Sequence, residues 1–358
     1  MVQKMALSSK ERVLKALNFQ RPDRMPIFDS FWKEFIEKWH KEKGFSQEID
    51  IYDYYGIDLS VLVADETFFP SSKRVIKKEG NYLISQDGWG RTVKTRESSY
   101  FSQTIDTVLK NKDDLEHLKF EPADLDSRYK DFLEKVKEEK VKRAVFCKIG
   151  GPFIRSSFIR GEKEFLMDLV SDKVFAKALV EKVGNHLLSI GLESLRRANL
   201  YDTGIWIYDD MGSNDAPMFS PKTFEEIFLP VYKKMVKTLK KAGAKKVILH
   251  CDGNCISLLD MLIEAGIDGI NPVEPKAGMN ILELKKKYGN KLSYIGGVDN
   301  ALVLPSGDKE KIKNHILPIL EAGKEGGIII GTHSIGPDIS VETYDYYSTL
   351  IENYGIYE

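Results

Sequence analysis

Eight short apolar runs recur along the chain, and amphipathic helical patterns separate most of them. The runs are Met25–Asp29, Leu59–Asp65, Ala144–Gly150, Gly204–Asp210, Lys246–Asp252, Gly266–Glu274, Leu292–Asp299 and Gly327–His333. Such alternation is typical of a parallel sheet with crossover helices, and eight repeats favour closure into a barrel. The sequence therefore predicts an α/β fold, a (β/α)8 TIM barrel, with an open doubly wound sheet as the alternative. No linker or internal repeat is visible, so we expect a single domain over residues 1–358.

Two segments lie outside this alternation. Ser8 and Glu11 have the spacing of a capping box and precede an apolar stripe, which predicts an N-terminal helical extension. Arg74–Lys78, Tyr82–Ser85 and Arg91–Arg96 have the pattern of short antiparallel strands separated by glycine-containing turns. We expect this β-hairpin excursion to lie on the barrel's C-terminal face, as a rim or a lid beside the mouth.

Composition narrows the class of protein. The net charge of −1 gives no electrostatic footprint for nucleic acid and no basic patch for a membrane surface. No run approaches the roughly 18 apolar residues of a membrane span, and the first ten residues contain no signal core. The three cysteines, Cys147, Cys251 and Cys255, form no disulfide framework. We therefore expect a cytoplasmic enzyme or binding protein with a small-molecule ligand.

Polar residues or glycines stand at the ends of the predicted strands. They are Asp29, Asp65, Gly150, Gly151, Asp209, Asp210, His250, Asp252, Glu274, Asp299 and His333. Strand ends converge on one mouth of a barrel, where such enzymes place their chemistry. Turn formation explains Asp65 and Asp299 equally well, because aspartate is a common turn residue. It explains the two histidines poorly.

His250 and Asp252 are two residues apart on one predicted strand. Their side chains should therefore point to the same face, with Cys251 on the other. An imidazole beside a carboxylate suits either a metal ion or an acid–base pair. His333 and Glu274, at the ends of other strands, would complete a tetrahedral zinc site with one open position.

Several motifs, in order along the chain, resemble one known family. They are Glu-Arg-Val-Leu-Lys-Ala-Leu at 11–17, Pro-Asp-Arg-Met-Pro at 22–26, Ser-Pro-Lys-Thr-Phe at 220–224, Leu-Pro-Val-Tyr at 229–232, Gly-Gly-Val-Asp at 296–299, and Gly-Pro-Asp at 336–338 with Glu342. Together they resemble the uroporphyrinogen decarboxylase-like superfamily. The resemblance implies a TIM barrel and one of two activities, decarboxylation of a porphyrinogen or corrinoid-dependent methyl transfer.

The residues that depart from the family's patterns separate its branches. Uroporphyrinogen decarboxylases carry an arginine-containing loop after the first strand, but residues 28–34 here read Phe-Asp-Ser-Phe-Trp-Lys-Glu. Thiol (coenzyme M-type) methyltransferases bind zinc through a His-x-Cys pair and a later Cys. His250 matches that histidine, but Asp252 and His333 stand where the cysteines would be. Compared with thiolates, nitrogen and oxygen ligands make a bound metal ion a harder Lewis acid, which suits a substrate that binds through oxygen.

The resemblance therefore implies an O-demethylase-type methyltransferase, which passes a methyl group from an O-methyl substrate, such as an aromatic methyl ether, to cobalt. The chain has no Asp-x-His-x-x-Gly motif for cobalamin, so the corrinoid would arrive on a separate partner protein. Alternatives are the decarboxylase-type lyase, a thiol methyltransferase, another lyase with or without zinc, and a non-catalytic corrinoid- or small-molecule-binding barrel.

The methyltransferase hypothesis assigns roles to further residues at the strand ends. An ether oxygen is a poor leaving group, so an acid must assist it, and Asp209, Asp210 and Tyr208 are the nearest candidates. The predicted substrate-binding residues are Asp29, Phe31, Trp32 and Trp206, whose rings would form a wall for a flat donor. Aromatic residues near strands are also common in cores, which is the structural alternative.

Overall fold

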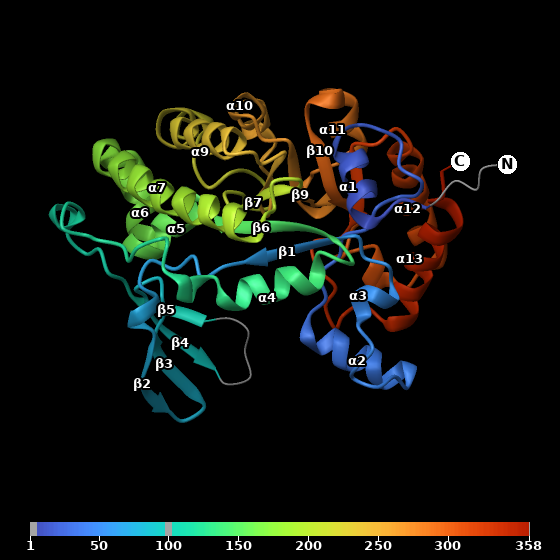
Figure 1. Cartoon of the computed structure of the whole chain (residues 1–358), viewed down its shortest axis with the longest axis horizontal. Coiled ribbons are helices and arrows are strands. Elements are labelled where there is room, and N and C mark those ends of the chain that lie inside the picture. Colours follow the sequence, from blue (N-terminus) through green and yellow to red (C-terminus); the bar gives the residue numbers. More distant parts are fainter. Residues whose placement is uncertain (1–5, 97–101, 358) are drawn as a thin grey trace.

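A computed structural model describes residues 6–96 and 102–357 of the chain. Its main element is a curled seven-stranded sheet in which every neighbouring pair of strands is parallel (Figure 1). In sheet order the strands are β1 (Leu59–Val63), β6 (Ala144–Gly150), β7 (Gly204–Tyr208), β8 (Lys246–His250), β9 (Gly269–Val273), β10 (Ser293–Gly297) and β11 (Ile328–Gly331). The mixed α/β class and seven of the eight predicted parallel strands are thus confirmed.

The first predicted strand, Met25–Asp29, differs from the expectation. Its residues form one isolated parallel bridge, Ile27 with Ile330, rather than a ladder. Toward β1 its backbone accepts one hydrogen bond, from Asp58 N–H to the Ile27 carbonyl at 2.9 Å. Pro26 has no N–H to donate, which weakens pairing at this position. A cavity of about 640 Å³ lies along the seam between residues 28–30 and β1, so this segment lies beside β1 without a continuous ladder.

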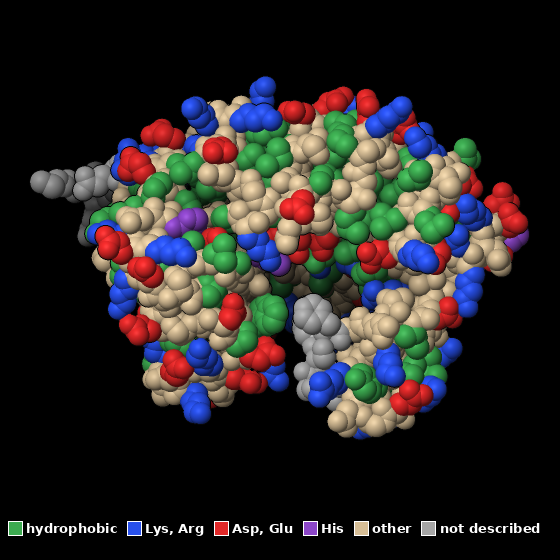
Figure 2. Space-filling view, turned by 180° about the vertical axis from the view of Figure 1, so that it is seen from behind, with side chains coloured by type: hydrophobic (Ala, Val, Ile, Leu, Met, Phe, Trp, Pro, Cys, Tyr) green, Lys and Arg blue, Asp and Glu red, His purple; other side chains and the backbone are tan. Residues whose placement is uncertain are grey.

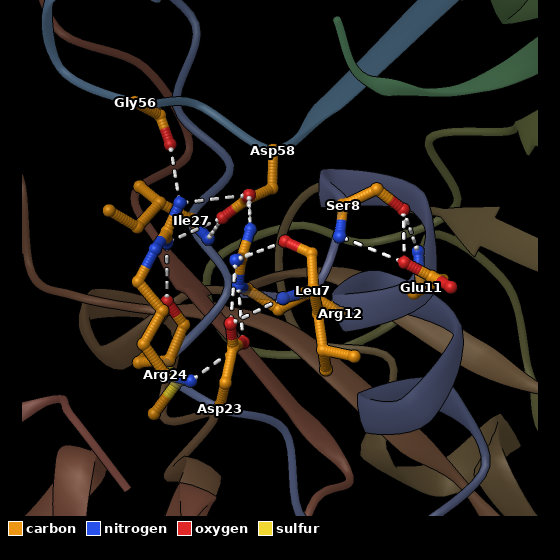
Figure 3. A network of polar contacts seen from close by, with 10 residues as sticks. Leu7, Ser8, Glu11, Arg12, Asp23, Arg24, Ile27, Gly56 and Asp58 are labelled. Carbon is orange, nitrogen blue, oxygen red and sulfur yellow. Dashed lines mark hydrogen bonds and ion pairs between the residues drawn. The ribbon is translucent and has the colours of Figure 1, made fainter. Parts of the chain in front are cut away.

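Side chains join this segment to β1 at the N-terminal end of the sheet (Figure 3). The Asp58 carboxylate is completely buried and accepts from Arg12 Nη1 at 2.7 Å, Arg24 Nη1 at 2.8 Å and the Ile27 amide at 3.0 Å. Arg12 also forms two hydrogen bonds to Asp23. Two guanidinium groups therefore offset the desolvation cost of one buried carboxylate more completely than a single partner would.

The helices surround the sheet, and α2 projects beyond it (Figure 1). Their bounds are α1 (Ser9–Leu17), α2 (Lys33–Lys43), α3 (Ile51–Tyr54), α4 (Lys130–Glu139), α5 (Pro152–Arg160), α6 (Glu162–Ser171), α7 (Lys173–Ala198), α8 (Pro221–Thr223), α9 (Leu229–Lys241), α10 (Leu259–Ala265), α11 (Ile281–Tyr288), α12 (Lys309–Gly323) and α13 (Val341–Tyr354). Both hydrogen bonds of the predicted capping box are present in α1. Of the described helices, none is long and apolar enough to cross a membrane.

The inner face of the sheet changes from apolar to polar along the strands. Its lower layer is one buried apolar cluster, to which α1 contributes from below: Val13, Ala16, Leu17, Leu59, Ala144, Phe146, Trp206, Ile248, Ile295 and Ile329. Side chains alternate along a strand, so the next inward positions are Lys148 after Phe146, Tyr208 after Trp206 and His250 after Ile248. The first inward-facing polar side chains therefore lie one layer beyond the apolar cluster, at the mouth formed by the C-terminal strand ends.

A four-stranded antiparallel sheet follows the C-terminal end of β1. It comprises β2 (Arg74–Glu79), β3 (Tyr82–Gln86), β4 (Thr92–Arg96) and β5 (Ser102–Asp106), so the predicted excursion has one strand more than expected. Ring contacts join it to α5, with the Arg91 guanidinium 3.7 Å from the Phe158 ring centroid. Figure 2 shows the surface hollowed between this sheet and the α2–α3 region, with acidic and histidine side chains at the inner end.

Candidate active site

Three side chains meet at the ends of β8 and β11. Asp252 Oδ1 lies 3.1 Å from His250 Nε2 and 3.3 Å from His333 Nε2. One potential ligand atom from each residue lies within 4.8 Å of the other two. The two-residue spacing of His250 and Asp252 thus places both side chains at one point, and the curl of the sheet brings His333 to it.

Neighbouring residues fix the orientation of both imidazoles. His250 Nδ1 lies 2.7 Å from the Asn271 side-chain oxygen, and His333 Nδ1 lies 3.3 Å from Glu274 Oε1. Glu274 is itself held by the Gly253 amide, which donates to Oε2 at 2.8 Å. When Nδ1 carries the proton, each Nε2 keeps a free lone pair, as in histidines that bind metals. The structure therefore brings Asp252, rather than Glu274, to the Nε2 atoms.

The triad of His250, Asp252 and His333 fits a metal ion. His250 Nε2 and Asp252 Oδ1 are buried, and neither makes a well-oriented hydrogen bond within the described residues. Buried polar atoms without partners are unfavourable, and a shared cation would satisfy both. Two imidazole nitrogens and one carboxylate oxygen form a donor set of the catalytic zinc type, which leaves the fourth position for water or substrate.

The charges of the triad and its neighbours reinforce one another. Burial by itself lowers the pKa of His333, but its contact with Glu274 and the charge of Asp252 raise that pKa above the usual value. Burial opposes ionisation of Asp252 and Glu274, yet the histidines hold the pKa of both carboxyls below the usual range. The carboxylates thus stay ionised at neutral pH, the state in which they bind cations.

Two of the predicted catalytic residues lie against the triad. The Tyr208 ring stacks on the His250 imidazole, with centroids 4.4 Å apart and an angle of 14° between planes. Asp210 Oδ1 accepts from the Asp252 amide at 3.2 Å and lies 3.8 Å from His250 Nε2. Burial, together with the charge of Asp252, raises the pKa of Asp210. Asp210 is therefore placed to hold a proton beside the triad.

Asp209, the third predicted catalytic residue, faces away from the mouth. It is completely buried and accepts from the amides of Phe153 and Ile154 in the first turn of α5 and from the Tyr232 hydroxyl. Burial raises its pKa to about 7, against the effect of these hydrogen bonds. A Cβ on Gly151 would lie 2.1 Å from Asp209, so glycine permits this close approach. The geometry of Asp209 is that of an anchor for α5.

The predicted substrate-binding residues are mostly engaged in packing. Asp29 is 1% exposed and accepts from Thr332 N and Oγ1, each at 2.7 Å, and from the Tyr344 hydroxyl at 2.9 Å. Burial raises the Asp29 pKa to about 6, despite these bonds. Phe31 is buried and its ring stacks on Phe35. Both side chains therefore hold residues 28–31 in place.

The two predicted tryptophans have different settings. Trp206 is buried in the apolar layer below the mouth, where its ring contacts Phe28 and Phe146 edge-on. Trp32 precedes α2 and is 40% exposed. Trp206 and the partly buried Phe28 thus belong to the apolar layer directly beneath the triad. Trp32 lies at the N-terminal end of α2.

Sequence reasoning missed two residues beside the triad, Asn271 and Lys148. Each is a polar residue within an otherwise apolar strand, Asn271 in β9 and Lys148 in β6. That isolation was the available signal, because a polar side chain within a buried strand needs a partner. Their partners, however, come from neighbouring strands and are not visible from local spacing.

Comparison with known proteins identifies the family. The family model described as uroporphyrinogen decarboxylase (URO-D) matches residues 83–354, about three quarters of the chain. The chain belongs to the URO-D family. Within the match lie β6 to β11 and therefore all members of the triad.

Solved structures give a similar result for the fold. A methyltransferase from Methanosarcina mazei has a TM-score of 0.73 at 18% identity, over 97% of this chain and 99% of that one. A B12-independent methionine synthase from a Shewanella species gives a TM-score of 0.44 at 12% identity, over 93% of each chain. A search of curated proteins finds no match. The first likeness shows that this URO-D chain shares its fold with a methyltransferase across nearly its whole length.

Proposed function

We propose that the chain is a corrinoid-dependent methyltransferase of the O-demethylase type. It would take a methyl group from an O-methyl donor, such as an aromatic methyl ether, and pass it to the cobalt of a corrinoid on a separate protein. The observation that carries the proposal is the triad of His250, Asp252 and His333, whose potential ligand atoms converge at the mouth. The fold shared with a structure named as a methyltransferase supports the same class.

The donor set favours an oxygen substrate over a thiol. All three cysteines of the chain are buried, and the triad is built from nitrogen and oxygen atoms. Thiolate ligands would make a metal softer and suit a thiol substrate, whereas this set leaves it harder. The arrangement therefore supports O-methyl chemistry over thiol methylation.

The charges at the mouth argue against a porphyrinogen substrate. A substrate with four to eight carboxylates needs several cationic partners. Near the triad lie three carboxylates, Asp210, Asp252 and Glu274, against two lysines, Lys148 and Lys276. The Lys33 side chain, within residues 28–34, is 86% exposed. Decarboxylation of such a substrate is accordingly the less supported activity.

The protein's own residues account for positioning and proton supply. The triad would hold the metal, and a bound zinc ion supplies Lewis acidity toward the donor's ether oxygen. A corrinoid on the partner would supply the electron pair that accepts the methyl group, and the donor oxygen would keep the electrons of the broken C–O bond. Asp210, whose carboxyl oxygen lies 3.8 Å from His250 Nε2, would protonate that donor oxygen, and burial raises its pKa in the direction that this role needs. Cobalt is the nucleophile, so no activated Ser or Cys is required of the chain.

A metal analysis combined with a methylation assay tests the proposal. We expect about one zinc ion per chain and loss of the cob(I)alamin absorbance when methoxylated aromatics are supplied. The metal-free protein, prepared with a chelator, should be inactive and recover on addition of zinc. If the zinc-loaded protein fails to methylate cob(I)alamin with every O-methyl donor supplied, the proposal is contradicted.

A further inference from the structure

His333 stands on a loop, unlike the other histidine of the triad. β11 ends at Gly331 and His333 lies at a bend two residues later, whereas His250 is the last residue of β8. Within the described ranges, 6–96 and 102–357, the backbone N–H and C=O of His333 make no hydrogen bond to other backbone groups. A strand ladder therefore fixes His250, but the position of His333 depends on the residues on either side of it.

The residue before His333 is held by a buried carboxylate. Thr332 donates to Asp29 Oδ1 from both its amide and its hydroxyl, each at 2.7 Å. Asp29 Oδ2 accepts from the Tyr344 hydroxyl of α13 at 2.9 Å. Thr332 and Asp29 are each 1% exposed, so water does not replace these bonds. The bonds between Asp29 and Thr332 thus fix the backbone at the start of the His333 loop.

The backbones of the two segments approach closely at this point. The Phe28 amide donates to the Ile330 carbonyl at 2.9 Å, and a Cβ on Gly331 would lie 1.8 Å from the Phe28 carbonyl oxygen. Glycine permits that approach without a shift of either segment. Because the backbones are so close, the short Asp29 side chain reaches Thr332 directly.

The residue after His333 is held as well. Asn300 Nδ2 donates to the Ser334 carbonyl at 2.7 Å. With the loop held on both sides, His333 Nε2 lies 3.3 Å from Asp252 Oδ1. Asn300 is partly exposed and makes one hydrogen bond to the loop, whereas Asp29 is buried and accepts from the loop at both the amide and the hydroxyl of one residue. Asp29 is therefore the firmer of the two supports.

We propose that Asp29 is a positioning residue of the metal site and acts on His333 through Thr332. The inference rests on the proposed function and adds a residue from the first predicted strand, whose buried side chain contacts the loop and α13 rather than the triad. Without the carboxylate, the buried Thr332 amide has no acceptor, and relieving that cost requires the loop to shift toward water. Such a shift would carry His333 Nε2 away from Asp252, and the site would lose one of its three ligands.

The zinc affinity of folded variants tests this role, by competition with a chromophoric chelator. We expect Asp29→Ala to weaken zinc binding about 10- to 100-fold, as the loss of contacts that orient metal ligands does. Asp29→Asn keeps an oxygen that accepts from Thr332, so it should retain most of the affinity. The matched control is Tyr344→Phe, which removes the bond to the other Asp29 oxygen and leaves both Thr332 bonds, so its zinc affinity should equal that of the wild type.

A double-mutant cycle with His333 separates positioning from a general structural effect. If Asp29 acts only through His333, Asp29→Ala should cause no further loss of zinc affinity in a protein that already carries His333→Ala. Thr332→Val removes only the hydroxyl bond, so it should give a smaller loss than Asp29→Ala, and it supplies the test if Asp29→Ala does not fold. Thermal melting of each variant checks that it is folded.

The imidazole NMR signals of the metal-free protein give a readout that needs no zinc. The chain has six histidines, and His333→Ala assigns the signals of His333. These signals should shift in Asp29→Ala and keep their positions in Tyr344→Phe. If the wild type binds no zinc, the metal of the proposed function is contradicted and these signals decide the inference, which unchanged His333 signals in Asp29→Ala overturn.

For a protein that binds zinc, three results overturn the inference. They are unchanged zinc affinity in Asp29→Ala (or in Thr332→Val, if the first variant does not fold), an equal loss with and without His333, and an equal loss in Tyr344→Phe. Methyl transfer from methoxylated aromatics to cob(I)alamin is measured in parallel. Zinc binding that depends on Asp29 through His333, without methyl transfer from any donor, contradicts the proposed function and leaves the positioning role standing.

Discussion

Replacing Asn271 by alanine removes the group that holds the far nitrogen of His250. The Asn271 side chain is 3% exposed, and its oxygen lies 2.7 Å from His250 Nδ1. Without this acceptor the imidazole is free to rotate or to carry its proton on Nε2, the atom that faces Asp252. Loss of such an outer contact lowers metal affinity about 10- to 100-fold, which corresponds to about 1.4 to 2.7 kcal/mol.

Competition with a chromophoric zinc chelator measures this change directly. Asn271→Asp is the matched variant, because a carboxylate keeps an acceptor for Nδ1 and should retain most of the affinity. The substitution to alanine also loses the bond from Asn271 Nδ2 to the Ile295 carbonyl at 3.3 Å, about 1 kcal/mol, which a folded domain tolerates. An Asn271→Ala protein with wild-type zinc affinity would refute the orienting role.

Three further outcomes are expected. His250→Ala should lose both metal and methyl transfer while keeping its circular dichroism spectrum; full activity in this variant would exclude His250 from the site. The chain without any added corrinoid should not demethylate a donor, because it supplies no nucleophile of its own, and product formation without cobalt would contradict this. Burial raises the Asp209 pKa to about 7, above about 3.9 in an unfolded chain, so the native state retains a proton that the unfolded state releases. Its contribution to the free energy of unfolding should therefore fall as pH rises from about 4 to 7. Because Asp29 also has a raised pKa, denaturation at several pH values should show a steeper fall in the wild type than in Asp209→Asn. Equal pH dependence of the two proteins would contradict this.

Periodicity predicted most of the sheet, and its exceptions have local causes. The parallel strands are short apolar runs followed by helices, a pattern that sequence carries directly. The run at Met25–Asp29 looks the same, but Pro26 removes a donor and the Asp58 side chain takes the Ile27 amide. β5 escaped prediction because Ser102–Asp106 is exposed along its whole length and has no apolar face to reveal it.

The candidate site was predictable where spacing along one strand decides geometry. His250 and Asp252 share a face because side chains alternate, and Asp209 and Asp210 take opposite faces for the same reason. Which aspartate faces the mouth depends on the register of β7, where Trp206 and Tyr208 point inward. The sequence predicted Asp29 as a substrate-binding residue but could not reveal its hydrogen bonds, because its partners Thr332 and Tyr344 lie about 300 residues further along the chain.

The seam at residues 23–31 has a consequence for the order of folding. Each parallel strand finds its neighbour in the next repeat of the chain, so the sheet can extend progressively during synthesis. Residues 23–31 contact Asp58, just before β1, but their other partners lie in the last repeat: the Met25 amide donates to the Gly355 carbonyl at 2.7 Å, and Ile27 pairs with Ile330. Contacts this distant in sequence form slowly. The N-terminal segment, although made first, would therefore complete its pairing last, and until then its edge toward β11 would expose unpaired backbone to other chains.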